Sequence, residues 1–163
     1  MKCPDCGHQN ILGADTCDAC SASLTNAPES PKRGMEKRIL EGKLSDLSPK
    51  KATQVKPSDS ILKAVEAMRK EKIGCVLAVE EDECVGMLSE RELILMVPET
   101  QDLAKSSVRS AMFTYPTCLR HDDDLAVTFH QMTLSGHLHM PVRLKDGSFG
   151  VVSARDLLRY LCK

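Results

Sequence analysis

The chain has 163 residues, of which 42% are hydrophobic and 28% are charged, and its formal net charge is -1. This composition suits an ordinary folded protein with a packed core, while the balanced charge and an aromatic content of 3% give no support to nucleic-acid binding. No apolar run approaches the roughly 20 residues of a membrane span, and the first residues lack the apolar stretch of a signal peptide. We therefore expect a cytoplasmic protein without membrane contact.

Two tight cysteine pairs dominate residues 1–24, namely Cys3 with Cys6 and Cys17 with Cys20. Cytoplasmic cysteines usually remain thiols, and four thiolates on two Cys-x-x-Cys turns are typical of a closed, tetrahedral zinc site. A segment this small should not fold on apolar burial alone, because chains below about 40 residues normally need a metal or a disulfide. The pattern predicts one structural Zn(2+) held by these four residues.

Alternative interpretations of the cysteine pairs are weaker. A thioredoxin-like dithiol would need a βαβ context that is missing here, and an iron site of the rubredoxin type normally has a longer chain and aromatic packing. The segment CPDCGHQNILGADTCDACSASL resembles the short zinc-ribbon family, with Thr16 where an aromatic residue is frequent and Ser21 where glycine is usual. Because Asp5, Asp15 and Asp18 make the segment acidic, contact with a protein partner is favoured over contact with nucleic acid.

Residues 25–42 are expected to form a linker and a short helix. The stretch TNAPESPKRG is polar and contains Pro28, Pro31 and Gly34, which is typical of a flexible tether. We interpret the basic run of Lys32, Arg33, Lys37 and Arg38 as a solvated linker surface rather than a phosphate site.

The rest of the chain is an internal repeat. A shift of 64 residues aligns its two halves without a gap, with eight identities. A self-match at a fixed period indicates repeated structural units. The identical pairs are Thr53/Thr117, Asp59/Asp123, Met68/Met132, Asp82/Asp146, Gly86/Gly150, Ser89/Ser153, Arg91/Arg155 and Leu93/Leu157.

Each half shows the same predicted order of strand, helix, strand, strand, helix. Residues 58–60 and 122–124 suit helix caps, apolar residues then recur at helical spacing, and Gly74 and Gly136 lie just beyond, where the chain should reverse. The predicted strands cover 52–56, 75–80 and 84–89, then 116–120, 139–144 and 148–153, and the closing helices cover 90–97 and 154–161.

Neither half has enough apolar material to be stable alone. We therefore expect an α/β (α+β) fold in which two βαββα repeats, residues 43–100 and 101–163, pack with pseudo-two-fold symmetry beside a small zinc ribbon. Such packing leaves two equivalent clefts between the repeats, and these clefts are where a ligand should bind.

The same motif ends each repeat, where a strand runs into a helix. Serine followed three residues later by an acid is typical of a helix capping box. The alternative is ligand binding, because a helix N-terminus and a hydroxyl suit a phosphate, an acid can hold ribose hydroxyls, and arginine can reach phosphate. The motif comprises Gly86, Ser89, Arg91 and Glu92 in the first repeat, and Gly150, Ser153, Arg155 and Asp156 in the second.

Residues 43–163 resemble a pair of cystathionine-β-synthase-type (CBS) domains, a Bateman module, on the evidence of the repeat, the HMPV strand and the second Gly-x-x-Ser-x-x-Asp motif. The resemblance implies a regulatory module that binds AMP, ADP, ATP, S-adenosylmethionine or NAD between its repeats, and a homodimer formed through helices. It also implies that Ser153 contacts phosphate, that Asp156 holds the ribose, and that Tyr115 and Thr117 line the base pocket, with His139 facing the same cleft.

In the first repeat, Thr53, Ser89 and Arg91 occupy the matching places, but Glu92 stands where aspartate is usual. A longer acid reaches a ribose with poorer geometry, so the second-repeat cleft is the better predicted site.

These observations favour a nucleotide sensor whose zinc ribbon contacts an unknown protein partner. A scaffold with empty clefts, in which the serine and acid pairs only cap helices, is the alternative. An enzyme is not expected, because no catalytic motif is present and a four-sulfur zinc site has no open position. Nucleic-acid contact through the ribbon is a further alternative, for which the basic signal is weak.

Overall fold

The computed structural model describes residues 1–11, 13–25 and 34–162, so the predicted tether over residues 26–33 lies outside the described residues. The chain divides into two compact units, Met1–Lys37 and Arg38–Lys163. Among the described residues, no helix is both long and apolar enough to cross a bilayer.

The first unit is built from two similar turns, each closed by backbone hydrogen bonds. The Cys3 amide donates to the His8 carbonyl at 2.9 Å, and the Cys17 amide donates to the Ala22 carbonyl at 2.9 Å. Ser21 stands in the left-handed region with φ 58°, a conformation that favours glycine. The buried apolar residues of this unit are few: Cys3, Cys17 and Leu24.

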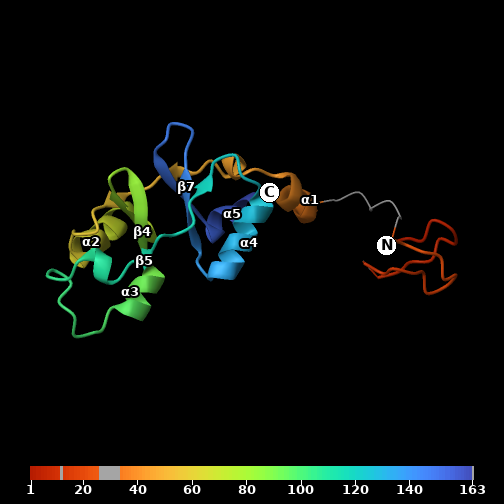
Figure 1. Cartoon of the computed structure of the whole chain (residues 1–163), viewed down its shortest axis with the longest axis horizontal. Helices are drawn as coiled ribbons and strands as arrows, with labels where there is room; N and C mark the ends of the chain where they lie inside the picture. The colour runs from red at the N-terminus through yellow and green to blue at the C-terminus, as the bar shows by residue number, and fades with distance from the viewer. Residues whose placement is uncertain (12, 26–33, 163) are drawn as a thin grey trace. The chain divides into compact units, whose positions relative to one another are not determined.

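The second unit contains the two predicted repeats, and the predicted α/β fold class is confirmed (Figure 1). The first repeat consists of β2 (Gln54–Val55), α2 (Ile61–Glu71), β3 (Cys75–Glu80), β4 (Glu83–Ser89) and α3 (Glu90–Met96). The second consists of β6 (Leu119–Arg120), α4 (Leu125–Ser135), β7 (His139–Arg143), β8 (Phe149–Ser153) and α5 (Ala154–Leu161). The remaining elements are α1 (Gly34–Glu41), β1 (Lys50–Lys51), β5 (Phe113–Thr114) and two short 3-10 helices, η1 (Leu44–Leu47) and η2 (Val108–Ser110).

The ends of the first helix in each repeat follow from local residue chemistry. The Ser60 side chain accepts a hydrogen bond from the Lys63 amide at the start of α2, as an N-cap should. Gly136 ends α4 with φ 65°, as predicted. In α2 the equivalent left-handed residue is Lys72 with φ 55°, not Gly74. Gly74 instead allows a close approach, since a Cβ there would lie 2.9 Å from Nε2 of His139.

The two four-stranded sheets exchange strands, which the sequence did not indicate. Their orders are β2-β3-β4-β5 and β1-β8-β7-β6. Strand β1 precedes β2 in the first repeat but pairs with β8 of the second, and β5 precedes β6 in the second repeat but pairs with β4 of the first. Each repeat therefore completes the sheet of the other, and the two repeats are joined by backbone hydrogen bonds as well as by packing.

Gly150 is where β1 and β8 meet most closely. A Cβ at Gly150 would lie 2.8 Å from the Lys50 carbonyl oxygen and 3.0 Å from a Leu144 methyl carbon. Because backbone cannot move aside cheaply, we expect Gly150→Ala to lower the free energy of unfolding by about 1–3 kcal/mol. Urea unfolding measures this, with the exposed Lys145→Ala on the same hairpin expected to change stability by less than about 0.5 kcal/mol. Equal stability of Gly150→Ala and the parent would contradict the strand exchange.

Three apolar clusters define the layers of this unit. One lies between α2 and the first sheet and one between the helices and the second sheet, with Ile61 and Leu125 as fully buried members. A third cluster contains Leu77, Met87 and Phe149, which come from both sheets. The two sheets therefore face each other, with the helices on the outer faces, and residues at the ends of the central strands lie between the repeats.

Candidate functional site

The four predicted metal ligands are brought together in the first unit. The Sγ atoms of Cys3, Cys6, Cys17 and Cys20 all lie within 4.8 Å of one another. The Cys3–Cys20 and Cys6–Cys17 sulfur pairs are 3.7 and 3.6 Å apart. A tetrahedral ion with metal–sulfur bonds of about 2.3 Å requires sulfurs about 3.8 Å apart, so these thiols fit a metal of that kind.

Asn10 links the two cysteine turns and was not singled out from the sequence. It is 5% exposed. Its Nδ2 donates to the His8 carbonyl and to Cys17 Sγ, at 3.2 and 3.5 Å, while its Oδ1 accepts from the Asp18 amide at 3.0 Å. Burial raises the pKa of the Cys17 thiol, but amide donors and Asn10 outweigh it and lower the pKa to about 6. The contacts of Cys17 therefore favour its thiolate, the form that binds metal.

At the start of α5, Ser153 and Asp156 form a complete capping box. Asp156 Oδ2 accepts from the Ser153 amide at 3.0 Å and from its hydroxyl at 2.6 Å, while Ser153 Oγ accepts from the Asp156 amide at 3.3 Å. Among the described residues, the other carboxylate oxygen, Oδ1, has only a 3.6 Å ion pair with Arg159, and the Asp156 side chain is 35% exposed. One oxygen of Asp156 thus remains accessible to a further donor.

The equivalent acid of the first repeat is engaged on both oxygens. Glu92 Oε2 accepts from the Ser89 amide at 3.1 Å and from the Ser89 hydroxyl. Glu92 Oε1 lies 3.3 Å from His137 Nε2 and 3.7 Å from Arg91 Nη1. Thr53, predicted for the same cleft, instead donates its hydroxyl to Glu71 at the end of α2. The two matching motifs therefore differ in whether their acid can accept a further hydrogen bond: Asp156 can, and Glu92 cannot.

His139 lies between the repeats, opposite Ser153 in the β7–β8 ladder. Burial lowers the pKa of its imidazole and outweighs the carboxylates of Glu90, Glu92 and Asp156, which act in the opposite direction. His139 therefore favours its neutral form in the folded protein.

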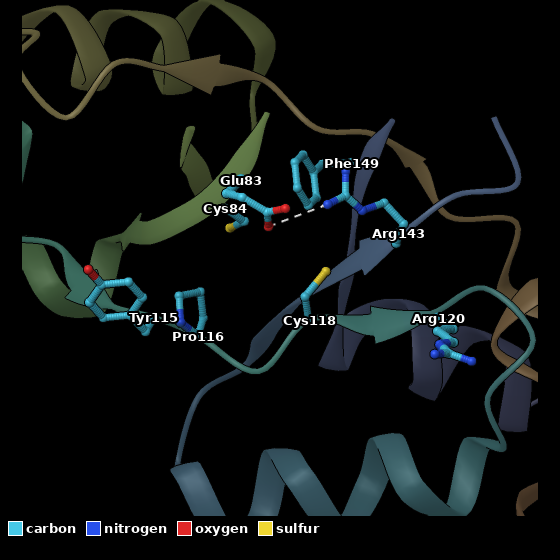
Figure 2. A pocket seen from close by; sticks show the side chains of 8 residues that line it. All are labelled: Glu83, Cys84, Tyr115, Pro116, Cys118, Arg120, Arg143 and Phe149. Carbon is cyan, nitrogen blue, oxygen red and sulfur yellow. Dashed lines mark ion pairs between the residues drawn. The ribbon is translucent and has the colours of Figure 1, made fainter. Parts of the chain in front are cut away.

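A cavity of about 380 Å³ lies between the repeats at the other end of the same ladder. Figure 2 shows its lining, with the Arg143 guanidinium beside the Phe149 ring and directed toward Glu83. Arg143 lies 4.0 Å from the Phe149 ring centroid and 3.5 Å from the Glu83 carboxylate. The lining residues are Glu83, Cys84, Tyr115, Pro116, Cys118, Arg120, Arg143 and Phe149.

Tyr115 is the predicted site residue that lines this cavity. It is 80% exposed and has φ 47°, an unusual conformation for a residue other than glycine and one that often marks a functional position. Phe149 at the cavity and Ser153 are four positions apart along β8, a distance of about 13 Å. Thr117 and Arg155 are exposed, and neither they nor Ser153, Asp156 and His139 line the cavity as the described residues define it.

The CBS domain family matches residues 44–99 and 108–163, one copy on each repeat. The chain belongs to this family. CBS domains are regulatory modules and are generally not catalytic, so Arg38–Lys163 is a regulatory CBS pair.

Known relatives share the fold at low identity. An uncharacterized 17.7 kDa protein of Acidianus ambivalens, from the bps2 3' region, is 26% identical over 121 residues, covering 73% of each chain. The CBS domain structure NE2398 matches with a TM-score of 0.67 and 20% identity, covering 74% of this chain and 94% of that one. The CBS domain protein PAE2072 of Pyrobaculum aerophilum, solved with AMP, matches with a TM-score of 0.62 and 22% identity, covering 74% and 98%.

The half-buried His139 makes the stability of the CBS pair depend on pH. Because its pKa is lowered on folding, the unfolded chain binds a proton that the folded chain does not. Stability should therefore fall as pH decreases below the ordinary histidine pKa of about 6.5, at less than about 1.4 kcal/mol per pH unit because the ring is only partly buried. Urea unfolding between about pH 7.5 and 5.5 tests this. A His139→Gln variant with the same slope would contradict the assignment.

Proposed function

We propose that the CBS pair senses an adenosine nucleotide, AMP, ADP or ATP foremost, bound in the second-repeat cleft. The observation that carries the proposal is the difference between the two acids. Asp156 keeps one accessible carboxylate oxygen, whereas both oxygens of Glu92 are engaged. A ribose hydroxyl needs such an acceptor, and the AMP complex of PAE2072 supports the ligand class.

In this proposal, Asp156 holds the ribose, while Ser153 and Arg155 contact phosphate at the start of α5. His139 faces the same cleft, and the base lies toward Tyr115 and Thr117. The exposed ring of Tyr115 supports a base pocket at this position, because an aromatic ring offers a face on which a base can stack.

For the first unit we propose a structural zinc ion on Cys3, Cys6, Cys17 and Cys20. Since the ion would have no open position, it would shape a small surface for a protein partner rather than perform chemistry. We also propose that the CBS pair forms a homodimer through its helices. The exposed apolar side chains of Ile94 and Leu95 on α3 and Leu134 on α4 support this, because burial of exposed apolar surface favours association.

Nucleotide binding is tested by thermal unfolding with AMP, ADP, ATP, S-adenosylmethionine and NAD at millimolar concentration. At least one should raise the melting temperature, because a ligand of the folded state stabilises it. Asp156→Asn should weaken binding by about 10–100-fold. This factor corresponds to the loss of a hydrogen bond to a charged group, which contributes about 1.5–3 kcal/mol.

The matched control is Asp122→Asn, since Asp122 is an exposed acid of the same repeat outside the proposed site. It should bind as the parent does. No stabilisation by any of the five compounds would favour a scaffold with empty clefts, in which Ser153 and Asp156 act only as a helix cap.

A further inference from the structure

A buried histidine from the second repeat lies against the first-repeat motif. His137 follows α4, and its side chain is 7% exposed. Its Nε2 lies 3.3 Å from Glu92 Oε1 and 3.3 Å from Arg91 Nη1. Its ring lies 4.3 Å from the Phe113 ring, centroid to centroid. The imidazole is therefore held between a carboxylate and an aromatic ring.

These contacts resemble those of a bound ligand more than those of a core side chain. The imidazole is a planar nitrogen heterocycle that lies tilted at 39° beside the Phe113 ring, and its Nε2 contacts the acid of the Gly-x-x-Ser-x-x-acid motif. The Nδ1 atom of His137 is buried and has no hydrogen-bond partner among the described residues. An unsatisfied buried nitrogen costs about 1–3 kcal/mol, so the contact at Nε2 must offset that cost.

No equivalent side chain lies against the acid of the second-repeat motif among the described residues. With the two halves aligned at 64 residues, Ile73 stands opposite His137, and an isoleucine side chain cannot hydrogen-bond a carboxylate. The matching acid, Asp156, has only Arg159 near its Oδ1. The clefts therefore differ in two residues, the acid itself, Glu92 or Asp156, and His137, which the second repeat contributes to the first cleft.

We propose that the imidazole of His137 occupies the ligand position of the first cleft, so that each chain has a single nucleotide site. His137 is then the residue that determines which cleft is available. The stoichiometry rests on the proposed nucleotide function, whereas the occupation of the cleft by His137 does not.

The first experiment measures AMP binding per chain by equilibrium dialysis. The parent should bind one AMP per chain. His137→Ala combined with Glu92→Asp, which restores the usual acid and removes the imidazole, should bind two. His137→Gln retains a side-chain donor for Glu92 and should still bind one. Binding of two AMP per chain by the parent, or of one AMP per chain by the double variant, would overturn the proposal.

The second experiment needs no nucleotide and uses free imidazole as the probe. His137→Ala leaves an imidazole-sized space beside Glu92, so added imidazole should raise its melting temperature in proportion to the logarithm of concentration. His130→Ala is the control, because His130 is exposed on α4 and its removal creates no buried space. Equal responses of the two variants would overturn the role of His137. Absence of AMP binding in every variant, together with selective rescue by imidazole, would reject the nucleotide function while supporting the occupied cleft.

Discussion

Chelation of the metal should unfold residues 1–24 and leave the CBS pair folded. Among its described residues, the first unit buries only Cys3, Cys17 and Leu24 as apolar residues, which is too little to offset the entropy of ordering its backbone. Structural zinc supplies about 10–16 kcal/mol in small domains of this kind. On addition of a strong zinc chelator, hydrogen exchange at the Cys17 and Leu24 amides, both hydrogen-bonded within the unit, should accelerate to the rate of an unstructured peptide.

Metal content provides the matched control for this prediction. The protein should contain one zinc per chain, and Cys17→Ser should lose it, because three thiolates bind zinc less well than four. Cys162→Ser should retain one zinc, since Cys162 is an exposed cysteine of the other unit. Iron in place of zinc would support the rubredoxin-type alternative. Unchanged amide protection after complete removal of metal would show that the ion has no structural role.

The sequence predicted the repeat and its elements because both depend on local patterns. Helical spacing in α2 and α4, and the serine and acid pairs at α3 and α5, can be recognised within a few residues. The exchange of β1 and β5 between the sheets could not be predicted in this way. Each strand is two residues long, too short for an alternating pattern, and its partner lies in the other repeat. Pairing at such distance in sequence is set by tertiary packing.

For the candidate site, the sequence identified which residues form the motifs, but it did not show which of their side chains are free to contact a ligand. The four cysteines are brought together as their spacing predicts, and Ser89 and Ser153 both cap helices. His137 was missed because it lies beyond a helix in no motif. A signal was present, however: Glu92 replaces aspartate in the repeat that faces His137, and the aligned residue in the other half is Ile73. Paired departures from repeat symmetry therefore indicate contacts between the repeats.

Phe149→Ala should be the most damaging single substitution in the CBS pair. Phe149 is 4% exposed and belongs to the cluster that joins the two sheets, and its ring lies 4.0 Å from the Arg143 guanidinium. Truncation of a buried phenylalanine costs about 3–5 kcal/mol, a large share of the roughly 5–15 kcal/mol that stabilises a typical domain. Urea unfolding should show a decrease of that size in the free energy of unfolding.

Tyr115→Ala is the matched control, because it removes a ring of similar size from the same cavity while the side chain is 80% exposed. Its expected effect on stability is below about 0.5 kcal/mol. Arg143 also donates to the carbonyls of Asp82 and Gly147, which lie in the hairpin turns of the first and second repeats. Loss of the Phe149 ring should therefore release Arg143 and loosen both turns, which hydrogen exchange near Asp82 and Gly147 would detect. Similar stability losses in the two variants would mean that the inter-sheet cluster does not hold the repeats together.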